Sequence, residues 1–300
     1  MLVFIVNSIL ILSINNMGYN GIVWRWIMRI RHNISMQTIV NNRNMVLNQL
    51  SKSFRKLSSG KRITCPADDP AGFMISERMK SQIRGLRQAS RNAQDAISLV
   101  QTAESGMGDM VDILQRIREL YVQASNGTLT DKDRDKIGNE IDTLKETLIG
   151  IREHTEFNTM GLLDGSHNKG DFTFQVGANT GDSRDVHIED MSLDFLGLDS
   201  LKDINSEDVD ENIGIVDDAL NRVSSQRSSL GAQQNGLEAT IRRLDVQAEN
   251  LQAAESRITD LDMAQEMMKF AKLQILDQVN QFLMAHAKSD AEMVLQLLKM

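Results

Sequence analysis

Hydrophobic residues recur every seven positions through two long stretches of the chain, and most of the positions between them are polar. The first stripe consists of Leu86, Ala93, Val100, Met107, Leu114 and Tyr121; the second consists of Val216, Val223, Leu230, Leu237, Leu244, Leu251 and Ile258. Heptads sustained over this length are typical of a coiled-coil seam. We therefore predict two long helices that pack antiparallel. The second, from Asn212 to Ile258, would be roughly 70 Å long at the rise of an α-helix.

Three further helices are predicted from shorter patterns. The apolar residues Met36, Val40, Leu47, Leu50, Phe54 and Leu57 fall on one face of a helix near the N-terminus. The helix of the first stripe begins after the turn-rich segment LSSGKRITCPADDPAG, with Asp69 as N-cap and Pro70 at the first position. Thr130 precedes a shorter helix whose apolar side carries Ile137, Ile141, Leu144, Leu148 and Ile151. The C-terminal heptads continue at Leu261, Met268, Ile275 and Phe282.

The segment from about 157 to 198 is different, because it is rich in Gly, Asp and Asn. Two short strand-like runs, FTFQVGA and VHI, are separated by the turn-rich NTGDSRD, and Asp164-Gly165 predicts another turn. We expect a small β-hairpin region at the far tip, where the chain reverses between its two helical arms. The predicted fold is mainly α.

Composition and charge exclude several function classes. The formal net charge is −8, and basic and acidic residues are mixed along the chain, which argues against nucleic-acid binding. A single cysteine, Cys65, excludes an internal disulfide framework. The histidines are scattered without metal-ligand spacing: His32, His154, His167, His187 and His286. We expect no enzyme activity, no cofactor and no metal.

The first 27 residues differ from the rest of the chain. The apolar run MLVFIVNSILIL lacks the basic start and cleavage site of a signal peptide, and a membrane span needs about 20 apolar residues. We expect Met28 to be the true start and 1–27 to be a mis-translated or non-native extension. The alternative is a real sorting segment.

Several longer segments resemble one protein family. KLSSGKRITCPADDPAG (56–72), SERMKSQIRGLRQASRNAQDAISLVQTAE (76–104) and LQRIRELYVQASNGT (114–128) are similar to the N-terminal signature of bacterial flagellins. HTEFNTMGLLDGS and FTFQVGAN resemble the family's middle segment. AENLQAAESRITDLDMAQEMMKFAKLQIL (248–276) and the closing VLQLL resemble its C-terminal signature. The similarity extends from Met28 to Met300.

The resemblance implies a subunit that is exported and polymerises through its terminal coiled-coil helices into a flagellar filament. The implied partners are further copies of the chain, an export chaperone, and the filament cap and hook-junction proteins. The filament would be extracellular, or periplasmic in a spirochaete. The implied organisation is a filament-core helix and turn (28–70), two parts of a helical domain (71–156 and 212–260), a reduced variable region (157–211) and a C-terminal filament-core helix (261–300).

The resemblance also assigns roles to particular residues. Contacts within the filament, and binding of a vertebrate innate immune receptor, are carried over to Gln115, Arg116, Leu120, Gln123 and Glu140. The alternative for Arg116 is a solvated helix face with a local pair to Glu119. Packing in the filament core and export-chaperone binding are carried over to Met268, Ile275 and Phe282.

Two other functions remain as alternatives at this stage. The first is a hook–filament junction protein, which shares both terminal signatures. The second is a coiled-coil scaffold or signalling protein without export.

Overall fold

The computed structural model describes residues 33–165, 170–201 and 209–297, so the expected extension at 1–27 lies outside the described residues, as do His32 and His167. The chain divides into two compact units. One combines the segment up to Thr64 with the segment from Leu261 onward, and the other is Cys65–Asp260. The predicted mainly α fold, with long helices and small antiparallel strand pairs, is confirmed.

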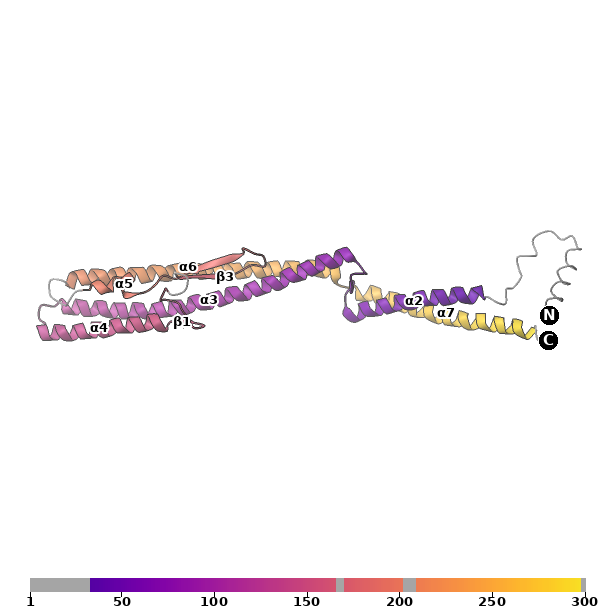
Figure 1. The fold of residues 1–300 in the computed structure, drawn as a ribbon, viewed down its shortest axis with the longest axis horizontal. Helices are drawn as coiled ribbons and strands as arrows, with labels where there is room; N and C mark the ends of the chain where they lie inside the picture. The colour runs from indigo at the N-terminus through magenta and orange to yellow at the C-terminus, as the bar shows by residue number, and fades with distance from the viewer. Residues whose placement is uncertain (1–32, 166–169, 202–208, 298–300) are drawn as a thin grey trace, which may run out of the picture. The chain divides into compact units, whose positions relative to one another are not determined.

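The larger unit is built on two long helices, α3 (Pro70–Ala124) and α6 (Val209–Thr259). α3 begins as predicted, because the Asp69 side chain accepts a hydrogen bond from the Gly72 N–H at 3.0 Å and Pro70 occupies the first turn. Figure 1 shows α3, in purple, and α6, in orange, side by side. The Arg118–Asp217 ion pair, at 2.7 Å, connects the C-terminal part of α3 to the N-terminal part of α6, so the two helices are antiparallel.

The core of this unit follows the heptad stripes. Leu86, Ala93, Val100, Met107, Leu114 and Tyr121 are buried on α3, and Val216, Val223, Leu230, Leu237 and Leu244 are buried on α6. Leu251 and Ile258, at the end of the second stripe, are partly buried. α4 (Asp131–His154) packs on α3 and contributes Ile137, Ile141 and Leu148. The result is a long core of aliphatic side chains between helices.

Two strand pairs follow α4. β1 (Glu156–Phe157) and β2 (Met160–Gly161) form a minimal hairpin, whose turn residues Asn158 and Thr159 have φ of 51° and 62°. β3 (Asp171–Gln175) pairs antiparallel with β4 (Ser183–His187). A short helix, α5 (Leu193–Leu196), and a 3-10 turn, η3 (Leu198–Ser200), follow. The predicted strand runs are therefore confirmed, although the turn of the first hairpin is Asn158-Thr159; Asp164-Gly165 lies after β2.

The β3–β4 hairpin does not lie at the tip, so that part of the prediction was wrong. Asn92 of α3 donates its side-chain N–H to the Gln175 carbonyl at 3.0 Å. Gln226 of α6 likewise donates to the His187 carbonyl at 3.1 Å. The hairpin therefore lies along the two helices. The physical reason is that the chain already reverses in the short loop after α3, and α4 carries it back along α3 before the strands begin.

The smaller unit is a helix pair. α2 (Ile34–Ser59) ends at Gly60, which adopts a left-handed φ of 67°, and α7 is Met263–Leu297. The Leu261 N–H donates to the Gly60 carbonyl at 3.0 Å, where the two segments meet. Both predicted terminal helices are confirmed.

Two glycines of α3 provide a matched pair for a stability test. A Cβ at Gly106 would lie 2.6 Å from Thr155 Oγ1, whereas a Cβ at Gly108 would meet nothing within 4 Å. We expect Gly106→Ala to lower the free energy of unfolding by about 1–3 kcal/mol through overpacking. We expect Gly108→Ala to raise it by up to about 1 kcal/mol, because alanine favours helix. Urea unfolding followed by circular dichroism measures both; equal effects of the two substitutions would contradict this packing.

Tyr121 provides a test by titration. Burial, together with the nearby Asp142 carboxylate, raises the pKa of the phenol from 10.0 to about 12. The unfolded chain then ionises first, so this contribution to stability is complete below pH 10 and is lost between pH 10 and about 12. We expect phenolate absorbance to show a high-pH step that Tyr121→Phe removes. A full titration near pH 10 with helicity intact would contradict the burial.

Candidate assembly surfaces

Exposed hydrophobic side chains concentrate on the α2–α7 pair. Of the eighteen large hydrophobic residues that are exposed in the described chain, four lie on α2 and nine on α7. Those on α2 are Ile34, Met45, Leu47 and Phe54, and those on α7 are Met263, Met267, Met268, Ile275, Leu276, Val279, Phe282, Leu283 and Met293. A contiguous apolar helix face left in water is typical of a surface that binds another chain.

The predicted heptad positions of α7 face away from α2. Met268, Ile275 and Phe282 are 69%, 60% and 70% exposed, whereas Glu266 and Leu273 are buried. This stripe therefore does not pack on α2 within the chain. Its predicted roles in filament-core packing and export-chaperone binding stay predictions.

Two polar contacts connect α2 and α7 inside the pair. The Ser53 hydroxyl donates to Glu266 Oε1 at 2.5 Å, and both residues are buried. Arg43 Nε donates to Asp277 Oδ1 at 3.1 Å. Leu273 of α7 is also buried, while the exposed apolar residues of both helices remain on the outside.

An open groove of about 710 Å³ lies along this pair. It is lined by Leu47, Leu50, Ser51, Phe54, Arg55 and Phe270, so both helices contribute to it. Its walls are mostly aliphatic and aromatic, with one guanidinium at the edge. Such a surface can receive an amphipathic helix through its apolar face.

A second candidate surface surrounds Arg116 on α3. Its guanidinium donates to Glu140 Oε1 of α4 at 2.8 Å and to Glu119 Oε2 at 3.2 Å. The hydrogen bond to Glu140, followed by that to Glu119, raises the pKa of Arg116 above its ordinary value. The structure therefore contains the contact of Arg116 with α4 and also its local pair with Glu119, which the sequence analysis treated as alternatives. Gln115 and Gln123 are exposed on the same helix.

Leu120 requires a correction within this set. The residue is 1% exposed and belongs to the same buried cluster as Ile137 and Ile141 of α4. It cannot present its side chain to a partner while α4 packs on α3. Val122, which was not predicted, is an exposed apolar residue two positions further along α3, with 51% of its surface accessible.

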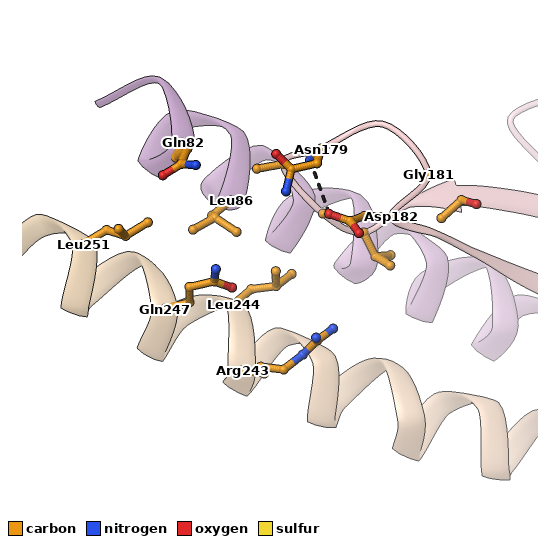
Figure 2. Close-up of a pocket in the computed structure, with 13 residues that line it drawn as sticks. Gln82, Leu86, Asn179, Gly181, Asp182, Arg243, Leu244, Gln247 and Leu251 are labelled. Atoms are coloured by element: carbon orange, nitrogen blue, oxygen red, sulfur yellow. Dashed lines mark hydrogen bonds between the residues drawn. The ribbon is translucent and has the colours of Figure 1, made fainter. Parts of the chain in front are cut away.

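A third concave region lies between the β3–β4 loop and the long helices. Its volume is about 270 Å³. Figure 2 shows Leu86 of α3 pointing toward Leu244 of α6, with Asn179 and Asp182 on the overhanging loop. The Asn179 N–H donates to Asp182 Oδ2 at 3.3 Å, which holds the loop closed on itself. No short motif indicates this pocket, because it depends on how the hairpin folds back onto the helices.

Within the described ranges, no group of three or more His, Cys, Asp and Glu side chains is placed to hold a metal ion. Among the same residues, no helix combines the length and apolar character that a membrane span needs.

The comparisons with known proteins agree with this geometry. Residues 30–168 match the bacterial flagellin N-terminal helical region, and residues 213–298 match the bacterial flagellin C-terminal helical region. The chain is 44% identical over 304 residues to the flagellin of Bacillus subtilis (strain 168), with 91% of this chain and 100% of that protein covered. It is 41% identical over 289 residues to the flagellar filament 33 kDa core protein of Treponema phagedenis, with the same coverage.

A solved structure supports the fold. The putative flagellar hook-associated protein from Vibrio parahaemolyticus aligns with a TM-score of 0.56 at 15% identity, over 64% of this chain and 100% of that one. At this identity the likeness concerns the fold alone. The two matched regions and the identities over nearly the whole chain carry the assignment. The chain belongs to the bacterial flagellins, the family of structural subunits of the flagellar filament.

Proposed function

We propose that this flagellin polymerises by burying the outward apolar faces of α2 and α7 against the same helices of neighbouring copies. The observation that carries the proposal is the concentration of exposed hydrophobic residues on these two helices. Fully burying each large side chain is worth about 1.5–3 kcal/mol. A single chain cannot recover this free energy, whereas a filament of many copies can.

The Arg116 surface is proposed as a lateral contact in the same filament. Arg116 is already oriented by Glu140 and Glu119, which reduces the side-chain entropy that a contact would otherwise cost. Gln115, Gln123 and Val122 lie exposed nearby on α3. Binding of a vertebrate innate immune receptor to this surface is a further proposal, which rests on the family resemblance.

Further proposed partners are an export chaperone, a filament cap protein and hook-junction proteins. An export chaperone would cover Met268, Ile275 and Phe282 before assembly, because unassembled chains with such a face aggregate. Filament cap and hook-junction proteins are proposed to meet the two ends of the polymer. We propose an extracellular filament, or a periplasmic one if the source is a spirochaete. No step in this function requires a catalytic group.

Seeded assembly tests the proposal. Purified full chain is mixed with short filament fragments, and a matched chain that ends at Phe270 lacks most of α7. We expect the full chain to extend the seeds into long filaments and the truncated chain to extend none, as judged by electron microscopy. A full chain that stays monomeric with seeds and a precipitating salt would contradict the proposal and favour a hook–filament junction role.

A further inference from the structure

Two polar contacts lie inside the seam of the α2–α7 pair, where apolar residues are the rule. Ser53 is 1% exposed and donates its hydroxyl to Glu266, which is 7% exposed, at 2.5 Å. Arg43 and Asp277 form an ion pair at 3.1 Å, with side chains 33% and 17% exposed. We call Ser53–Glu266 and Arg43–Asp277 the register pairs.

Both register pairs belong to one antiparallel alignment of the helices. Ten residues separate Ser53 from Arg43 on α2, and eleven separate Glu266 from Asp277 on α7. A further ten residues along both helices, the Asn33 side chain donates to the Ala287 carbonyl at 3.2 Å. Three contacts spread over the length of α2 therefore agree on a single register.

A slipped register would break these contacts. If α7 moved along α2 by one heptad, Glu266 would lie level with Val46, and Asp277 would lie near Met36. Each carboxylate would then face an aliphatic side chain inside the seam. Glu266 would keep only Lys269 of its own helix, at 3.6 Å, and Asp277 would keep only Gln281, at 2.6 Å. Polar groups that lose their cross-helix partner inside a seam cost stability, which is why single polar residues select register in coiled coils.

The groove depends on the same register, because both helices line it. α2 contributes Leu47, Leu50 and Phe54, and α7 contributes Phe270. A displacement of α7 would move the phenyl ring of Phe270 away from this wall. The groove is therefore a composite surface of both helices, and it forms only when the two helices are correctly aligned.

We infer that the register pairs select the alignment of α2 with α7 and thereby assemble the composite apolar surface that neighbouring copies recognise. This inference rests on the proposed function, since it takes the occupant of the groove to be a second copy of the chain. It assigns to Arg43, Ser53, Glu266 and Asp277 a positioning role in polymerisation. Their own side chains need not contact the neighbouring copy.

Exchanging the two charges of the Arg43–Asp277 pair tests the inference, because the double variant should restore the elongation that each single variant loses. Arg43→Glu and Asp277→Arg each place like charges in the seam, and the double variant restores an ion pair with reversed polarity. We expect each single variant to slow seeded elongation roughly tenfold or more. The double variant should recover to within about threefold of the wild type. Lys52→Glu, an exposed charge reversal on the same helix, is the matched control and should elongate like the wild type.

Crosslinking between introduced cysteines measures the register of α2 and α7 directly. In a Cys65→Ser background, Val46→Cys with Leu273→Cys marks the observed alignment, and Ile39→Cys with Leu273→Cys marks a one-heptad slip. A short bismaleimide should join the first pair in the otherwise unchanged chain. Arg43→Glu should lower that yield and raise the yield of the second pair.

The outcomes separate the inference from the function on which it rests. The inference would be overturned if the single variants elongated and crosslinked like the wild type. It would also be overturned if the double variant elongated as slowly as the slower of the two single variants. Either result would leave the proposed function standing. A wild-type chain that fails to extend seeds would remove the proposed function. Crosslinking would then still decide the register, and equal yields from the two cysteine pairs would overturn the inference.

Discussion

Replacing Met268, Ile275 and Phe282 together by serine is expected to abolish filament growth while leaving the α3–α6 unit folded. All three side chains project from α7 into solvent, so the single chain loses little when they are removed. Burial of each against a neighbouring copy is worth about 1.5–3 kcal/mol, so each subunit would lose about 5–9 kcal/mol of association free energy. At about 1.4 kcal/mol per tenfold change, the critical concentration should rise more than a thousandfold.

Sedimentation of seeded mixtures over a concentration series measures this critical concentration. The matched control replaces Lys272, Gln274 and Gln278, which are exposed polar residues on the same helix, by serine. We expect the control to change assembly far less, because its substitutions remove little apolar surface. Filaments of normal length from the Met268/Ile275/Phe282 variant would show that the outward face of α7 is not the polymerising surface.

The second large effect concerns the stability of the single chain. Leu237 is fully buried on α6 in the main core, whereas Val246 on the same helix is 57% exposed. Leu237→Ala should lower the free energy of unfolding by about 2–5 kcal/mol, because it leaves a cavity between rigid helices. Val246→Ala should change it by no more than about 0.5 kcal/mol.

Denaturant unfolding of the unassembled chain, followed at constant protein concentration, gives both values. Assembly has to be avoided, since association adds its own free energy to the apparent stability. A cost for Leu237→Ala as small as that for Val246→Ala would mean that the α3–α6 seam is loosely packed in solution.

The hydrophobic pattern predicted the helices and the seam of the larger unit, because two stripes of equal period bury each other there. Val100 and Leu230 illustrate this: both occupy predicted positions, and both are completely buried. The N-terminus of α3 was also predictable, since Asp69 and Pro70 act locally and need no tertiary partner.

The same pattern could not predict which partner covers a stripe. Met268, Ile275 and Phe282 repeat with the period of the α6 stripe, yet they point outward, because a different side of α7, which carries Glu266 and Leu273, is buried. Periodicity shows that a face is apolar; it does not show whether the covering helix comes from the same chain. The buried Ser53–Glu266 contact was equally invisible, because both residues are common on solvated helix faces.

Two local errors have a similar origin in tertiary packing. Leu120 was assigned to an outer surface, but α4 packs on α3 and Leu120 joins their common core. The β3–β4 hairpin was expected at the tip, but α4 returns the chain along α3 first, and Asn92 and Gln226 then hold the hairpin on the helices. Neither arrangement is encoded in a short segment of sequence.

A cryo-electron microscopy map of filaments grown from this chain would show which helices lie between neighbouring copies. We expect α2 and α7 of each copy to lie against the same helices of other copies, and Phe282, which is 70% exposed in the single chain, to become buried there. A filament in which Met268, Ile275 and Phe282 still face solvent, and copies meet only through the α3–α6 unit, would contradict this expectation.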